Sequence, residues 1–224
     1  MNSIWEMNAW QVIKAGGPIM APILLCSIFA LAIFIEKLIH FSSIKTDTTL
    51  LKKKIFEFLK NNQIKEAVQY CENNPSPVAR ILKAGLLQYG HPREEIKEGM
   101  EDASLFEIPK LEIRLNALAT IAHISPLLGL LGTVTGMTTC FHTIQVQAAS
   151  LNPVSPGDLA GGIWEALLTT VAGLMVAIPA YVAYNYCVHR INRFILEMER
   201  AATELINWMG QTAKVESHEI QTSY

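Results

Sequence analysis

One carboxylic acid, Glu165, lies inside a long apolar stretch of the sequence, Leu159 to Val188. A helix needs roughly 20 apolar residues to cross about 30 Å of hydrocarbon, and this stretch is long enough. Glu165 follows Asp158 by seven residues, which places it about 10 Å along such a helix. Because a charge at that depth costs about 3 kcal/mol on insertion scales, the side chain has to face protein or water. This acid therefore indicates either a hydrogen bond between helices or subunits, or a path for protons.

Two threonines, Thr133 and Thr170, could share such a path. Thr133 belongs to an uncharged stretch, Ala117 to Phe141, and Thr170 follows Glu165 by five residues. If the two stretches form antiparallel helices joined by a short loop, both threonines come to similar depths near the middle of the membrane. A threonine hydroxyl in a span either bonds back to its own helix or lines a wet path. We expect Thr133, Thr170 and Glu165 to form a partly polar lumen, with simple helix packing as the alternative.

Glycines surround these polar residues at helical spacing. Small residues let the backbones of membrane helices approach closely. We assign the following glycines to helix packing: Gly129, Gly132, Gly136, Gly161, Gly162 and Gly173.

The elements that position these residues are three membrane spans. A third long apolar stretch, Pro18 to Ile35, carries no charge. With 224 residues, the chain has too little polar sequence to wrap three such helices in a soluble core. Twelve Lys and Arg residues lie between Ser42 and Asn116, and none lies between Ile144 and Asp158. The positive-inside rule then predicts a cytoplasmic large loop and C-terminus and a periplasmic N-terminus.

The polar parts of the chain also show helical periodicity, and no strand-like alternation occurs. The fold class is therefore all-α, an integral membrane protein with three transmembrane helices and a helical cytoplasmic domain. We expect the second and third helices to extend into the cytoplasm. The second should begin at about Glu107, with a kink or a start at Pro109, and the third should end near Gly210. The predicted segments are a periplasmic amphipathic N-terminus (1–17), transmembrane helix 1 (18–41), the cytoplasmic helical domain (42–116), transmembrane helix 2 (117–143), a short periplasmic loop (144–158), transmembrane helix 3 (159–188), a cytoplasmic amphipathic helix (189–210) and a disordered tail (211–224).

Enzymatic chemistry is not indicated. The sequence lacks a P-loop, a G-x-S-x-G motif and an H-E-x-x-H motif, and its four cysteines form no C-x-x-C pair. His123 and His142 lie at opposite ends of the second span and cannot meet. We expect no metal and no cofactor, and the absence of a basic stripe argues against a nucleic-acid partner.

Two runs of the sequence resemble the ExbB/TolQ/MotA family of proton-channel subunits. They extend from Leu130 to Gly136 and from Glu165 to Ala180, and the head of the third span, Gly157 to Ile163, is also similar. The order of three spans, a large loop after the first and a long terminal helix agrees with the family as well. The flagellar motor subunit is less similar, since it has four spans and a longer chain.

The resemblance implies a role in the bacterial inner membrane. Family subunits form pentamers around the single-span helices of two ExbD- or TolR-type partners, and proton flow there energises TonB or TolA across the periplasm. Thr133 and Thr170 match threonines that face the central lumen, and Glu165 matches the in-membrane glutamate, whereas the acid that takes the proton belongs to the partner. The resemblance leaves the choice between an ExbB-like and a TolQ-like role open. A flagellar-type stator subunit, a substrate-binding transporter and a structural scaffold without ion conduction are the alternatives.

Overall fold

The computed structural model describes residues 15–44, 47–149 and 156–222, except for the side chains of residues 156, 158 and 211–222. Every regular element within these ranges is a helix, which confirms the predicted all-α class. The expected N-terminal amphipathic segment lies almost wholly outside the described residues. Of the short loop expected at 144–158, residues 150–155 also lie outside them, whereas residues 144–149 and 156–158 are helical.

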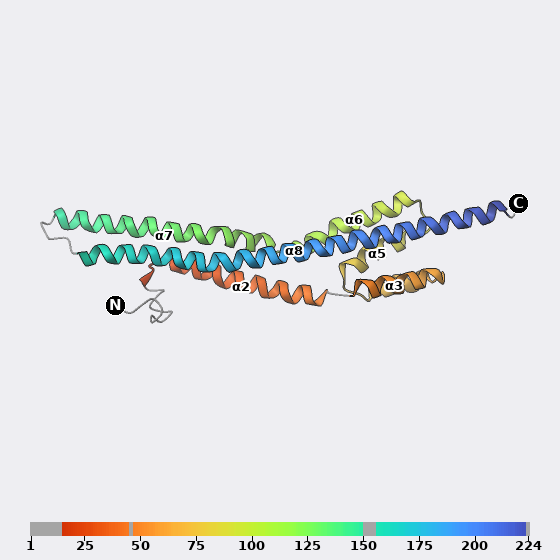
Figure 1. Ribbon diagram of the computed structural model, residues 1–224, viewed down its shortest axis with the longest axis horizontal. Coiled ribbons are helices and arrows are strands. Elements are labelled where there is room, and N and C mark those ends of the chain that lie inside the picture. The colour runs from red at the N-terminus through yellow and green to blue at the C-terminus, as the bar shows by residue number, and fades with distance from the viewer. Residues whose placement is uncertain (1–14, 45–46, 150–155, 223–224) are drawn as a thin grey trace. The chain divides into compact units, whose positions relative to one another are not determined.

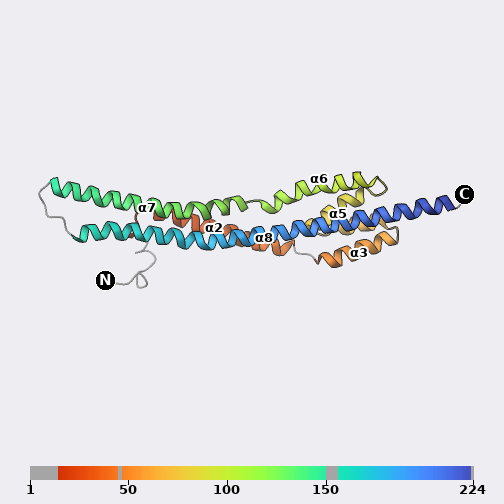
Figure 2. The same ribbon diagram turned by 45° about the horizontal axis from the view of Figure 1, so that its top comes forward.

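Among the described residues, three helices are long and apolar enough to cross a membrane, as predicted. They are α2 (Met20–Ser43), α7 (Leu115–Ala149) and α8 (Pro156–Thr222). The first part of α8 runs antiparallel beside α7 in both ribbon views (Figure 1 and Figure 2).

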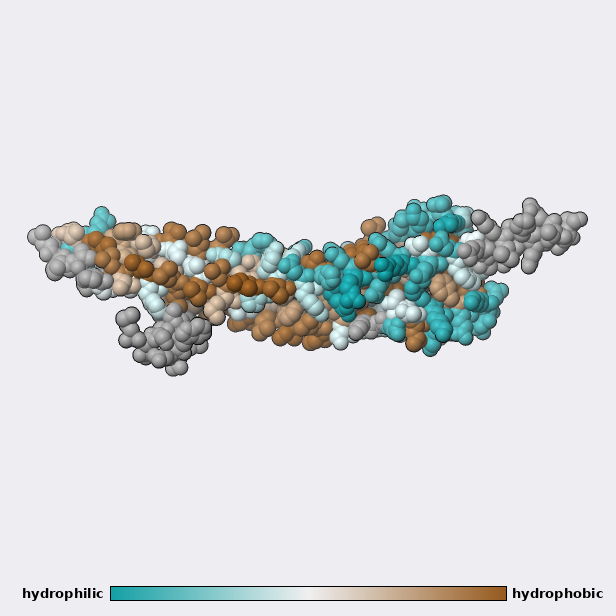
Figure 3. Space-filling model, viewed as in Figure 1, coloured by the Kyte–Doolittle hydropathy of each residue, from teal (hydrophilic) through white to brown (hydrophobic). Residues whose placement is uncertain are grey.

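The chain divides into two compact units. The first, here called the span unit, contains residues up to 36 and residues 114–186, and the second, here called the polar unit, contains residues 37–113 and those from 187 onward. Apolar side chains cover much of α7, α2 and the first part of α8, as Figure 3 shows in brown. Hydrophilic side chains dominate the surface of the polar unit in the same view. The apolar surface of the span unit therefore fits lipid, and the hydrophilic surface of the polar unit fits water.

Within the span unit, α7 and α8 meet along a seam of small residues. Gly132 lies opposite the side chain of Thr169, and Gly136 lies opposite Ala166. A Cβ atom added at Gly173 would lie 2.6 Å from the carbonyl oxygen of Ser125, which is a backbone atom and cannot swing aside. The glycines thus allow the two helices to touch through their backbones.

A second contact of the span unit joins α2 to the α7–α8 pair. Its core consists mostly of alanines, again a small-residue interface. Partly buried Ile33, Phe34, Ile121 and Tyr184 pack around it, and its buried members are Ala30, Leu118, Ala122, Ala180 and Ala183.

The polar unit packs four shorter helices with the second half of α8. These helices are α3 (Thr48–Lys60), α4 (Ile64–Glu72), α5 (Pro77–Leu87) and α6 (Arg93–Glu112). Two of them begin at side-chain caps, because Asp47 accepts hydrogen bonds from the backbone of α3 and Ser76 accepts one from the backbone of α5. Buried apolar residues, among them Leu51, Leu82 and Leu205, form the core of this unit.

Two helix boundaries differ from the predictions. The expected cytoplasmic extension of the second span is a separate helix, α6, because Ile113 is extended and Arg114 adopts a left-handed conformation with φ of 62°. Pro109 lies inside α6 and neither starts nor ends it. The third span continues beyond Gly210 to Thr222, where a disordered tail was expected. One glycine costs a helix only about 1 kcal/mol, and the residues that follow include good helix formers.

A buried acid, Glu107, anchors α6 to α5. Arg80 donates a hydrogen bond of 2.5 Å to this carboxylate and Lys110 donates one of 2.6 Å. Burial alone would raise the pKa of Glu107, but the hydrogen bonds and charges of Lys110 and Arg80 outweigh it and hold the pKa below its ordinary value. The carboxylate therefore stabilises the folded unit above the ordinary glutamate pKa of about 4.3, and this contribution is lost as the pH falls through the lowered pKa.

We expect Glu107→Gln to lower the free energy of unfolding by about 2 kcal/mol at neutral pH, because it weakens two charge-assisted hydrogen bonds. The difference from the parent protein should shrink as the pH falls from the ordinary glutamate pKa through the lowered pKa of the parent carboxylate. Denaturant titration of the solubilised protein, followed by circular dichroism, measures both effects. Glu101→Gln is the control, since its pair with Lys97 is exposed and spans 3.5 Å. Equal stability of the Glu107 variant and the parent at pH 7 would contradict the assignment.

The backbone contact at Gly173 predicts a second effect. Gly173→Ala should force α7 and α8 apart and cost about 2 kcal/mol, as overpacking typically does. Gly161→Ala should be tolerated within the chain, because nothing lies within 4 Å of a Cβ atom added there. Thermal unfolding in detergent compares the two variants. Similar melting temperatures for both variants would show that α7 and α8 do not touch through their backbones at Gly173.

Candidate functional site

The candidate site is the seam between α7 and α8, where both predicted threonines lie. Thr170 donates a hydrogen bond of 3.1 Å from Oγ1 to the carbonyl oxygen of Gly129 on the opposite helix. Thr133 instead donates a hydrogen bond of 2.7 Å to Leu130 of its own helix. Both side chains are half-buried. Each hydroxyl uses its hydrogen on a carbonyl group, and its oxygen can still accept hydrogen bonds.

The two threonines lie at similar heights and on one side of the helix pair. Gly129 faces Thr170 and Gly132 faces Thr169, so Thr133 and Thr170 lie within about one helical turn, or roughly 5 Å, along the axes. Thr133 follows Gly129 by four positions, and Thr170 follows Ala166 by four positions. Each threonine is therefore rotated about 40° around its own helix from a residue of the seam, in the N-to-C direction of rotation in both cases. In an antiparallel pair, equal rotations in one sense point to the same side. The structure thus brings these two predicted residues together.

Glu165 lies on a different face of α8. It precedes Thr170 by five positions, which is about 140° around the helix. Its Oε1 atom lies against Gly17, at the turn before α2, where a Cβ atom would overlap it. Gly17 has φ of +66°, a conformation that favours glycine. Within one chain the structure therefore places Glu165 beside the start of the first span and does not bring it to the threonines.

Five of the six glycines assigned to packing contact the opposite helix. Gly129, Gly132 and Gly136 do so from α7, and Gly162 and Gly173 do so from α8. Gly161 has open space around its Cα within the described residues. What these glycines do in an assembly stays a prediction.

Sequence reasoning missed two participants, Gly17 and Ser125. The run Gly16-Gly17-Pro18 signals a turn, but nothing in the pattern indicates that it receives Glu165. Ser125 is buried, bonds back to Ile121 and presents its carbonyl oxygen to Gly173. Ser125 could have been predicted from the sequence, because it is a small residue on the same helical face as Gly129 and Gly132.

Comparison with known proteins agrees with these features. Residues 73–200 match the model of the MotA/TolQ/ExbB proton channel family. A putative biopolymer transport protein ExbB-like 3 of Synechocystis is 34% identical over 172 residues, covering 76% of this chain and 80% of the relative. The biopolymer transport protein ExbB of Salmonella typhimurium is 31% identical over 221 residues, covering 91% of this chain and 85% of the relative. The Tol-Pal system protein TolQ of Pseudomonas aeruginosa is 38% identical over 128 residues, covering 50% of this chain and 53% of the relative.

The matched segment contains all of α7 and the part of α8 that carries Glu165 and Thr170, so it includes the whole seam. The family resemblance expected from the two motifs is confirmed. This chain is a multi-pass membrane protein that belongs to the MotA/TolQ/ExbB proton channel family.

Proposed function

We propose that this chain is the channel-forming subunit of an inner-membrane complex driven by the proton motive force. In this proposal it acts as ExbB or TolQ does and energises a TonB- or TolA-type protein that reaches across the periplasm. The similarity to proteins named for biopolymer transport and for the Tol-Pal system supports this role. The large loop and the C-terminus face the cytoplasm, in accordance with the distribution of Lys and Arg.

The observation that carries the proposal is the pair of hydroxyl groups on one side of the α7–α8 seam. Neither hydroxyl donates its hydrogen outward, and both oxygens can accept. They suit a partner that donates, such as a protonated carboxyl group or a water molecule that carries a proton. A single-span partner of the ExbD or TolR type, whose acid takes the proton, would meet this need.

Several copies are required to enclose such a path. A polar face within a span has to be sheltered from lipid, and the described residues of one chain leave both threonines partly exposed. We propose a homo-oligomer, a pentamer by family resemblance, around two copies of the single-span partner. The threonine sides of five copies would then line the centre with ten hydroxyl groups.

The energetics of proton transfer fit this arrangement. The motive force supplies about 2.3 kcal/mol per charge per 100 mV. A dry barrier of a few kcal/mol at the middle of the membrane would therefore stall the motor. Acceptor oxygens that hold water or the partner's carboxyl group at that depth lower such a barrier.

The double change Thr133→Val, Thr170→Val tests the function. Valine nearly matches threonine in shape, so the complex should assemble with close to parental yield. Energy-dependent work should nevertheless stop, because the acceptor oxygens are gone. The measurement combines a cellular assay of energy-dependent function with the yield of purified complex.

Two further variants serve for comparison. Thr138→Val is the matched control, because Thr138 also bonds back to its own helix on α7 but faces away from the seam. It should leave the function unchanged. Glu165→Ala should lower both yield and activity, since this acid packs against the start of the first span. Full activity of the double valine variant would support a structural scaffold instead.

A further inference from the structure

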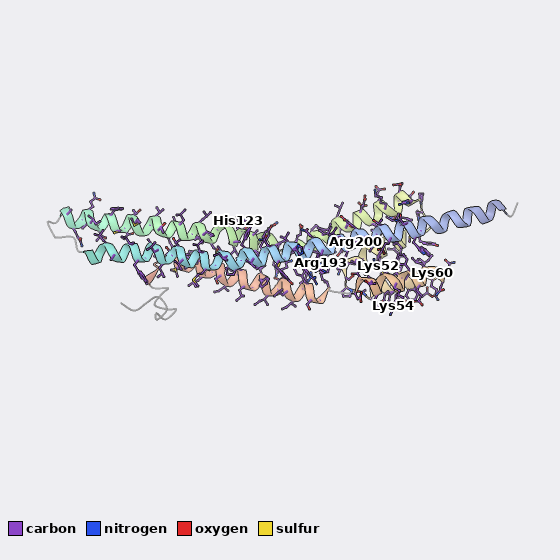
Figure 4. The ribbon with its side chains drawn as sticks, viewed as in Figure 1. Lys52, Lys54, Lys60, His123, Arg193 and Arg200 are labelled. Carbon is purple, nitrogen blue, oxygen red and sulfur yellow. The ribbon has the colours of Figure 1, made fainter. Side chains whose placement is uncertain are left out.

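An ionisable side chain, His123, lies exposed on α7 within its apolar stretch (Figure 4). Its ring meets that of Tyr181 on α8 edge to face, with centroids 6.3 Å apart and planes at 88°. Tyr184, also on α8, lies against Tyr181 with a centroid distance of 6.5 Å. A histidine and two tyrosines thus form a polar cluster in the span unit.

This cluster lies inside the apolar stretches, toward the end of each span that is opposite Glu165. His123 follows Arg114 by nine residues, and Tyr181 precedes Arg190 by nine residues, which is about 14 Å along each helix. An exposed ionisable group at such a depth faces water or protein in the assembled state, because contact with lipid is costly. The imidazole therefore requires either a neighbouring chain or a water-filled space.

The cluster is on the threonine side of the helix pair. Tyr181 follows Thr170 by eleven residues, which is about three full turns, so the two share one face of α8 about 16 Å apart. His123 touches Tyr181 and lies on α7 toward the end of the span opposite Glu165. On α7 itself, His123 is about 15 Å from Thr133 along the axis and about 80° around it, and its ring meets the threonine side through the contact with Tyr181.

The hydrogen bond of His123 identifies which nitrogen can take a proton. Its Nδ1 atom is 2.7 Å from the carbonyl oxygen of Ala119. A carbonyl oxygen only accepts, so Nδ1 carries the hydrogen and Nε2 carries the lone pair in the neutral ring. The backbone of α7 and the ring of Tyr181 thus orient the imidazole with Nε2 as its basic atom.

We propose that His123 is a proton-binding station between the threonine pair and the cytoplasmic end of the path. Nε2 takes a proton from water on the threonine side, the ring becomes an imidazolium, and Nε2 returns one proton to water on the cytoplasmic side. Histidine suits this task because it gains and loses a proton near neutral pH. This inference rests on the proposed function and adds a residue that the two threonine motifs do not include.

Proton flux into liposomes that contain the complete complex, purified with its single-span partner, tests the station. His123→Phe keeps the ring contact with Tyr181, and His123→Gln keeps a hydrogen-bonding group, but neither can carry a proton. Both should lower the flux by about tenfold to a hundredfold at neutral pH. His142→Phe, nineteen residues further along α7, is the matched control and should retain parental flux. Parental flux in both His123 variants would overturn the proposal.

The outcomes separate this inference from the proposed function. If the parent complex carries no proton flux, the proposed function fails. If the double valine variant loses the flux and the His123 variants keep it, only the station fails. If neither His123 variant assembles, ¹⁵N spectra of the parent complex test the proton-binding station instead. The hydrogen on the His123 ring should then exchange with water. A ring that is shielded from exchange with water would contradict the proposal.

Discussion

The backbone contact between α7 and α8 determines how the two threonines of the span unit are arranged. Gly173 and Gly129 place main-chain atoms of the two helices against each other, without side chains between them. Only at this separation can the Thr170 hydroxyl reach the Gly129 carbonyl group. The same contact fixes the rotation of both helices, and this rotation puts Thr133 and Thr170 on one side. Helix packing and the candidate path are therefore two consequences of one small-residue seam.

The seam also divides the helix pair into two sides with different surroundings. Glu165 projects from one side and lies against Gly17, at the start of α2. The threonines and the His123–Tyr181 cluster lie on the other side. An acid that packs against the first span can hold the outer end of the chain together. The opposite side presents acceptor oxygens and an imidazole, and in the proposed assembly this side faces the centre.

The sequence was sufficient to predict the three long apolar helices and the similar heights of the two threonines along the helix pair. Long uncharged stretches report membrane helices directly, and counting residues from their ends gives depth at 1.5 Å per residue. The partner of Glu165 was not predictable, because a contact between two spans depends on their packing and leaves no local pattern. The break at Arg114 was missed for a similar reason, since a left-handed arginine has no signature in composition. The continuation of α8 past Gly210 fits the good helix formers that follow this one weak breaker.

The central claim is that the threonine side of the seam faces water in the assembled complex. Thiol accessibility measures this directly, with a single cysteine placed at Thr133 or at Leu131, in the complete complex in membranes. Leu131 is 49% exposed and lies two positions away, on the far side of α7. A small charged thiosulfonate reagent should modify the cysteine at position 133 at least about tenfold faster, because the reagent requires a thiolate in contact with water. Equal protection at both positions, or faster reaction at 131, would contradict the account.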